Sequence, residues 1–460
     1  MRSRTGPGRT WPQRHRKASR LPIHRGFHAR ADYNDPRPFA WLAGGIRASL
    51  LPPVRTDFVD SLSRHVIAVK NDVRAKRLAI VVIVMAEMFG TSLWFSVNAV
   101  TDSLMHSWQI TLVDLGHLTS AVQLGFICGT FLFAISGLAD RYSASRIFFV
   151  CAVLGAIANA GFANTEGILV HAMALRFATG LALAGIYPIG MKLVMSWAPE
   201  KAGEMLGWLV GMLVLGTGLP QFIRGLGITP DWQMVFYSAS ALAVVAGVAV
   251  VLLGDGPHHG QHRQLRWGAV FDAFREPRFR SAALGYFGHM WELYAFWAIV
   301  PFLVADVGRG IDADITYLAA GFVFLAGGAG CVLGGIVSRR HGSARVAIVA
   351  LAGSAGMCLI YPWLHDQAYG LVIGGLFVWG FFVVADSPQF SALAAAACSK
   401  ASVGGALAFM NSIGFAISVV SIELVTRSWA LHDASVAWIL LPGPLFGLWA
   451  MRRLWANGYV

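Results

Sequence analysis

The chain has 460 residues, of which 56% are hydrophobic and only 13% are Asp, Glu, Lys or Arg. Soluble domains usually carry about 25% charged residues, so this composition excludes most soluble classes and indicates a membrane protein. The formal net charge of +12 would by itself also suit a nucleic-acid-binding protein. The placement of the basic residues, described below, argues against a nucleic-acid partner.

The first 77 residues differ from the rest of the chain. They are rich in Arg, Pro and His, and the first acidic residue is Asp32. No apolar core of a secretory signal follows the early basic residues. We expect 1–77 to be a basic, disordered N-terminal extension that is attracted to anionic lipid, or the product of a misassigned translation start. We do not expect functional residues there.

Beyond residue 77 the apolar residues come in blocks that match about 30 Å of hydrocarbon at 1.5 Å per residue. The links between blocks are short and leave no room for soluble domains. The sequence therefore predicts an all-α membrane protein with twelve transmembrane helices. They are expected at 78–99, 113–136, 147–163, 168–191, 204–226, 234–254, 281–305, 314–337, 346–364, 370–392, 403–425 and 434–452.

Basic residues are distributed unevenly between the two sets of loops. If the first helix runs outward, the inner loops, the C-terminal tail 453–460 and the segment 64–77 hold about twenty Lys and Arg. The outer loops hold only Arg309 and Arg427, with Arg224 at a helix edge. This asymmetry is the positive-inside pattern, and it predicts a multi-pass protein of the cell inner membrane with both termini in the cytoplasm.

The longest internal link, 255–280, follows six blocks and precedes six more. Its apolar residues recur at helical spacing, which predicts a short amphipathic helix on the inner membrane face. The link divides the chain into two six-helix halves, 78–254 and 281–452. Pro188 in the fourth block and Pro388 in the tenth are 200 residues apart, as expected for two repeats. Such repeats place a binding site at their interface, near the bilayer midplane.

Two local motifs link the chain to a known family. The link after the second block reads SGLADRYSASR and fits G-x-L-a-D-R-x-G-R-K at Leu138, Ala139, Asp140, Arg141 and Arg146. A weaker copy after the eighth block keeps Gly334 and Arg339 but has Ser338 in place of the acid, and the fourth block contains R-x-x-x-G at Arg176 and Gly180. Over 78–452 the sequence resembles the major facilitator superfamily.

The resemblance implies alternating access in a monomer, with Asp140, Arg141, Arg146 and Arg339 in conformational gating. The segments YFGHMWELYAFW and NSIGFAISVVS resemble a bacterial branch labelled nitrate/nitrite-like or cyanate-like. Nitrate carriers of the superfamily hold the anion with an Arg in helix two and another in helix eight. The blocks 113–136 and 314–337 contain no Arg, which argues against nitrate itself.

Ionisable side chains within the blocks are the main functional candidates, because each costs about 2.5–3.5 kcal/mol at the bilayer centre. The candidates for proton coupling are Glu292, His289, Glu87 and Asp386. His289 and Glu292 are spaced i, i+3 and share a helix face. They would either couple transport to protons and contact the solute, or form a polar clamp between helices one and seven. We favour Glu292 as the proton carrier.

Arg176 cannot give up its proton and must find an acceptor. Pairing with Glu87 and contact with an anionic solute are both possible. Trp94 would either line the cavity or pack at a helix interface. The expected solute-binding residues are Arg176, Trp94, Gln123, Tyr294 and Asn411.

The leading function is proton-coupled secondary active transport of a small, anionic solute. A drug/proton antiporter is an alternative, although helix five reads GTGLP and lacks the G-P-x-x-G-G of drug antiporters. A membrane sensor that binds a solute without moving it is another. The sequence contains no H-E-x-x-H, nucleophile elbow or P-loop, so an enzyme is not expected. No cofactor or metal site is expected either. The predicted partners are a small solute, protons and the lipid bilayer.

Overall fold

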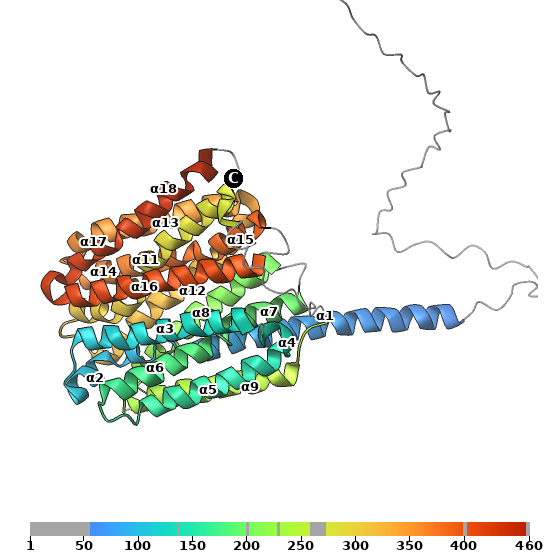
Figure 1. The fold of residues 1–460 in the computed structure, drawn as a ribbon, viewed down its shortest axis with the longest axis horizontal. Helices are drawn as coiled ribbons and strands as arrows, with labels where there is room; N and C mark the ends of the chain where they lie inside the picture. The colour runs from blue at the N-terminus through green and yellow to red at the C-terminus, as the bar shows by residue number, and fades with distance from the viewer. Residues whose placement is uncertain are drawn as a thin grey trace, which may run out of the picture. The chain divides into compact units, whose positions relative to one another are not determined.

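The computed structural model describes residues 56–136, 138–198, 202–227, 231–257, 273–398 and 403–456. Every regular element in these residues is a helix (Figure 1). The helices lie in one compact unit, His65–Val460, except for the start of α1, which belongs to the unit Met1–Arg64. The predicted all-α class is confirmed.

The first series of helices occupies the part of the chain that precedes the long link. It consists of α1 (Thr56–Thr91), η1 (Val97–Ala99), α2 (Thr101–Trp108), α3 (Leu112–Ser136), α4 (Leu138–Arg141), α5 (Ala144–Phe162), α6 (Leu169–Leu183), α7 (Tyr187–Trp197), α8 (Ala202–Gly225) and α9 (Gln233–Leu253). Helix α1 begins at Thr56, so the disorder that we expected for 1–77 does not extend to residue 77. Residues 1–55 lie outside the described part.

The second series follows the link. It consists of α11 (Pro277–Val307), α12 (Ala313–His341), α13 (Ser343–Leu364), α14 (Tyr369–Ala385), α15 (Ser387–Ala397), α16 (Val403–His432), η3 (Asp433–Val436), α17 (Ala437–Leu440) and α18 (Pro442–Ala456). The amphipathic helix expected in the link falls mainly on 258–272, which are not among the described residues.

In the described part of the chain, ten helical stretches are long and apolar enough to cross a membrane. The last of them, Ala406–Arg452, contains two successive long helices, α16 and α18. Helix α1 is not among the ten. The membrane-protein class is thus supported, whereas the count of twelve spans stays a prediction.

Two blocks that we expected to be continuous are broken at equivalent places. The fourth block divides into α6 and α7 around Ile186, and the tenth divides into α14 and α15 at Asp386. Pro188 and Pro388 each lie in the first turn of the second piece, where a missing backbone N–H costs nothing and where the ring hinders continuation of the preceding helix. The equivalence supports two structural repeats.

The two series meet along two pairs of long helices. Helix α3 packs against α16, and α8 packs against α12 (Figure 1). At the second contact a methyl group on Gly211 would lie 3.2 Å from the carbonyl oxygen of Gly328, so glycine allows the backbones to approach closely. The other extensive contacts, such as α3 with α6 and α11 with α18, lie within one series.

Candidate solute-binding site

A small cavity lies between the two series. Its lining comes from α7 and α8 on one side and from α11, α14, α15 and α16 on the other. The lining residues are Tyr187, Val210, Leu213, Val214, Tyr286, Met290, Leu293, Tyr294, Trp297, Val384, Ser387 and Phe415. The volume is about 20 Å³, which suffices for about one water molecule. This conformation is therefore closed around the site.

Aromatic rings close the cavity on the side where α1 leads into η1. The ring of Trp94 stacks on Phe415 with a centroid distance of 5.7 Å and an interplanar angle of 18°. It also lies 4.9 Å from Phe126 and 5.7 Å from Tyr294. Trp94 is buried and its Nε1 has no acceptor. In this conformation Trp94 packs within a cluster, and Tyr294 belongs both to this cluster and to the cavity wall.

The two predicted amides lie on the helices of this cluster. Gln123 lies one turn before Phe126 on α3 and is fully buried, and neither of its amide atoms has a hydrogen-bond partner. Asn411 lies one turn before Phe415 on α16 and is partly buried. Because a buried amide without partners is costly, Gln123 is the stronger candidate for contact with a solute in another conformation.

Arg176 does not pair with Glu87, contrary to one of our two expectations. Its guanidinium donates to the carbonyl oxygens of Leu93, at 3.0 Å, and of Trp94, and to Oδ1 of Asn159 at 3.2 Å. Arg176 is fully buried on α6. Both carbonyls belong to the turn after α1, where the backbone no longer forms helical hydrogen bonds. Arg176 therefore stabilises the end of α1.

Glu87 is fully buried on α1, and neither carboxylate oxygen has a hydrogen-bond partner. It lies against the start of α7, where a methyl group on Gly190 would overlap Oε2 of Glu87. Tyr187, one turn before Gly190, lies within electrostatic range of the Glu87 carboxylate and lines the cavity. An acid that lacks a partner thus lies directly behind the cavity wall.

His289 occupies the corresponding place in the second series. Its Nδ1 lies 2.8 Å from Oδ1 of Asp386, and both side chains are buried. Asp386 is the residue at the break between α14 and α15, just as Glu87 faces the break between α6 and α7. Unlike Glu87, these two groups have each other as partners.

Glu292 turns away from His289 and its partner. Its carboxylate accepts hydrogen bonds from Ser354 Oγ at 2.5 Å, Cys358 Sγ at 3.2 Å and Trp379 Nε1 at 2.6 Å. These donors lie on α13 and α14, so a clamp does exist, but it holds α11 to α13 and α14. The prediction of a polar clamp between helices one and seven was therefore wrong for Glu292. Nothing in this geometry connects Glu292 to the cavity.

The predicted gating residues lie at the end of the bundle that carries α4. Arg141, Arg146 and Arg339 are exposed, and the side chain of Asp140 is outside the described part. Sequence reasoning missed Asp255, whose carboxylate accepts from the backbone N–H of Ala144 at 3.2 Å and of Ser145 at 2.7 Å. It caps the start of α5. An acid directly after the sixth block was the signal that could have identified it.

At the opposite end, which carries α2, polar contacts join the two series. Nε2 of His117 on α3 lies 3.3 Å from Oε2 of Glu423 on α16. The amide of Asn98 donates to the carbonyl oxygen of Ala298 at 3.4 Å. Sequence reasoning also missed these contacts, because single polar residues near helix ends give no pattern.

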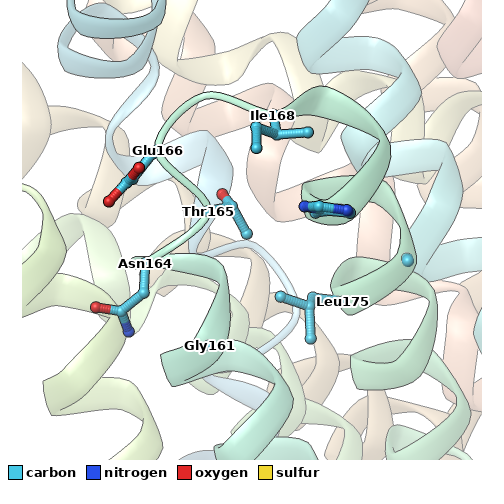
Figure 2. Close-up of a pocket in the computed structure, with 8 residues that line it drawn as sticks. Gly161, Asn164, Thr165, Glu166, Ile168 and Leu175 are labelled. Carbon is cyan, nitrogen blue, oxygen red and sulfur yellow. The ribbon is translucent and has the colours of Figure 1, made fainter.

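A second hollow lies away from the residues above, at the loop between α5 and α6. Figure 2 shows Asn164, Thr165 and Glu166 around it, with Ile168 and Leu175 opposite. Its volume is about 410 Å³, but it is open to the surface and most of its lining side chains are exposed. We assign no function to it.

The packing of two helix series around a central cavity agrees with comparison to known proteins. The model of the Major Facilitator Superfamily matches residues 80–421. The chain belongs to this superfamily. The structure of the proton:xylose symporter XylE bound to 6-bromo-6-deoxy-D-glucose superposes with a TM-score of 0.65 at 13% identity, covering 84% of this chain and 96% of that one. At this identity the likeness supports the fold alone.

Curated relatives of this superfamily member are transporters rather than enzymes. The chain is 23% identical to a quinolone resistance transporter of Acinetobacter baumannii over 65% of this chain and 76% of the relative. It is 24% identical to the niacin transporter NiaP of Acinetobacter baylyi over 61% of this chain and 70% of the relative. Transport of small solutes through a membrane is therefore the coarse function.

Proposed function

We propose that the chain is a secondary active transporter that moves a small organic acid across the inner membrane by alternating access, together with a proton. One observation carries the proposal: an unpartnered, fully buried acid, Glu87, lies behind a cavity that is lined by aromatic rings from both repeats. Cavities at a repeat interface are where such proteins bind solute.

The charge of the solute follows from the cavity lining. No Lys or Arg is among the residues that line the cavity, and the guanidinium of Arg176 already binds backbone carbonyls. A permanently charged anion would have no counter-ion there and would pay a large desolvation cost. An acid that enters with a proton avoids this cost, so the anionic solute of the sequence prediction becomes an acid carried in neutral form.

The rings of the cavity favour an aromatic acid, because aromatic pairs add about 0.5–1.5 kcal/mol beyond their buried area. Niacin, named for one relative, is such an acid. A nitrate or cyanate specificity has less support, since neither relative is named for such an ion and small anions need fixed cations.

Glu87 is the proposed proton carrier in place of Glu292. An ionised carboxylate without a partner would be strongly destabilised in this conformation, so we propose that Glu87 holds a proton here and ionises when water reaches it. His289 and Asp386 are a second, paired site, and Glu292, which accepts three hydrogen bonds, stays structural.

The finer membrane topology is also a proposal. We infer twelve spans by adding α1 and by counting α16 and α18 separately, with both termini in the cytoplasm and the α2 end outside. The monomeric state and the gating role of Asp140, Arg141, Arg146 and Arg339 rest on the family resemblance.

A second candidate is a drug/proton antiporter, which the aromatic cavity and the quinolone resistance relative also favour. A sensor without transport is the third. Uptake of radiolabelled niacin and benzoate into proteoliposomes separates them. We expect accumulation when the outside is more acidic, loss of accumulation with a protonophore, and no movement of nitrate. Quinolone movement against the proton gradient would favour the antiporter. Solute binding without any flux would favour the sensor.

A further inference from the structure

Glu87 has no direct access to the cavity in this conformation. Its exposed fraction is 0%, and it is not among the residues that line the cavity. If it exchanges a proton with the cavity, a neighbouring group must carry the proton through the wall. Among the described residues, the titratable group that both lines the cavity and interacts with Glu87 is Tyr187.

The position of Tyr187 suits this task. It is the first residue of α7, directly after the break in the fourth block, and Gly190 one turn later touches the carboxylate. Tyr187 is therefore one turn from the position at which α7 meets the Glu87 carboxylate. The side chain of Tyr187 is partly buried, and Tyr187 is among the residues that line the cavity. A phenol both donates and accepts a hydrogen bond, so it can receive a proton on one side and release one on the other.

The other titratable neighbours of Tyr187 are Cys331, Tyr286 and Tyr294. Tyr294 on α11 packs against Trp94 and Phe415, on the side of the cavity that belongs to the second repeat. Cys331 on α12 lies within electrostatic range, but its thiol donates to the carbonyl oxygen of Val384 at 3.3 Å. Tyr286 on α11 interacts with Tyr187 and lies on the side of the cavity that belongs to the second repeat. Its ring is 5.9 Å from His289, which already has Asp386 as a partner.

We propose that Tyr187 is a positioning residue that connects the Glu87 carboxyl group to the central cavity and sets how fast and how strongly this acid exchanges its proton. This proposal rests on the proposed role of Glu87 as the proton carrier. It concerns the path by which the proton passes between Glu87 and the cavity. Tyr286 occupies the comparable wall of the second repeat and provides a matched control, since it lines the same cavity but lies beside His289 rather than beside Glu87.

Infrared difference spectroscopy tests the proposal without a known solute. The purified full chain in lipid is titrated with pH and transferred to D₂O. A protonated carboxyl band that disappears in Glu87→Gln reports this residue. In Tyr187→Phe we expect the band to persist at the same frequency, because neither oxygen of Glu87 has a hydrogen-bond partner in this conformation. We expect it to exchange with deuterium about tenfold more slowly, because the cavity wall then lacks the hydroxyl that can accept and donate a proton. Tyr286→Phe should leave the band unchanged.

Tyr187→His, which restores a group that can donate and accept, should recover faster exchange and also provides a second variant if Tyr187→Phe is unstable. An unchanged exchange rate in Tyr187→Phe would overturn the path while leaving Glu87 as the carrier. Absence of any neutral-pH band that Glu87→Gln removes would mean that Glu87 is ionised, which overturns both the carrier and the path.

Discussion

Replacing Arg176 by Ala should destabilise the protein rather than merely weaken binding of an anion. The guanidinium supplies hydrogen bonds to two backbone carbonyls, of Leu93 and Trp94, and to Asn159. All three partners are buried, and both carbonyls lie beyond the end of α1 at Thr91. The carbonyl oxygen of Leu93 also accepts a hydrogen bond from Ser96 Oγ at 3.4 Å, so the groups that lose their partner are the Trp94 carbonyl and Oδ1 of Asn159. Each buried group that loses its partner costs about 1–3 kcal/mol, so we expect a loss of about 3–5 kcal/mol in the free energy of unfolding.

The assay is unfolding of the purified protein in mixed micelles, together with equilibrium solute exchange in proteoliposomes. Arg176→Lys should lose less stability, because an ammonium can still reach one carbonyl but cannot reproduce the planar fork. A stable Arg176→Ala variant with normal unfolding but abolished solute affinity would refute the reasoning. It would show that Arg176 binds an anion in a conformation in which the carbonyls find other partners.

A double-mutant cycle adds a sharper test of the corrected partner. Arg176 binds the carbonyl of Leu93, which lies six residues after Glu87, a separation of about 9 Å along a helix axis. The side chains of Arg176 and Glu87 share no hydrogen-bond partner among the described residues. The losses from Arg176→Ala and Glu87→Gln should therefore add to within about 0.5 kcal/mol. Recovery of stability in the double variant would mean that the two charges do pair.

Four other substitutions should separate packing, gating and coupling. Gly216→Ala should destabilise the protein, because a methyl group there would overlap the backbone of α1, whereas Gly207→Ala, with no atom nearer than 3.9 Å, should be tolerated; thermal unfolding compares them. His117→Ala should remove the contact with Glu423, worth about 0.2–1 kcal/mol for a partly exposed pair. It should raise labelling of a cysteine introduced at the cavity residue Ser387 from the α2 side by up to about fivefold. Glu292→Gln should lose stability by about 1–3 kcal/mol, since its new NH₂ faces donors, yet keep proton-driven accumulation; loss of accumulation at full stability would restore Glu292 as the carrier.

Much of the fold could be predicted because membrane-spanning helices are encoded in the length and composition of single segments. The ends of α5 (Ala144–Phe162) and α9 (Gln233–Leu253) lie within three residues of the expected 147–163 and 234–254. The 200-residue spacing of Pro188 and Pro388 indicated the repeat. That both prolines follow a break was not predicted, since a proline can kink a helix without ending it.

The partners of the charged residues could not be predicted in the same way. His289 and Glu292 do share a face, but three residues at about 100° each leave them about 60° apart. In a bundle interior this angle is enough for one to reach Asp386 and the other to reach Trp379. Helical spacing within one segment does not say which helix lies opposite. Arg176 shows the same limit, because two of its three acceptors are backbone atoms that have no signature in the sequence.

The two repeats carry titratable groups at comparable places, and the difference between them bears on how the protein works. In the second repeat His289 and Asp386 lie 2.8 Å apart and have each other as partners, so neither needs a new partner when the cavity fills with water. In the first repeat Glu87 has no such partner, and its charge becomes tolerable only when water or a donor reaches it. A change in the protonation of Glu87 should therefore shift the packing of α7 on α1 more than the packing of α15 on α11. We therefore expect the helices of the first repeat to move when Glu87 gains or loses a proton, while those of the second repeat keep their packing as the cavity opens.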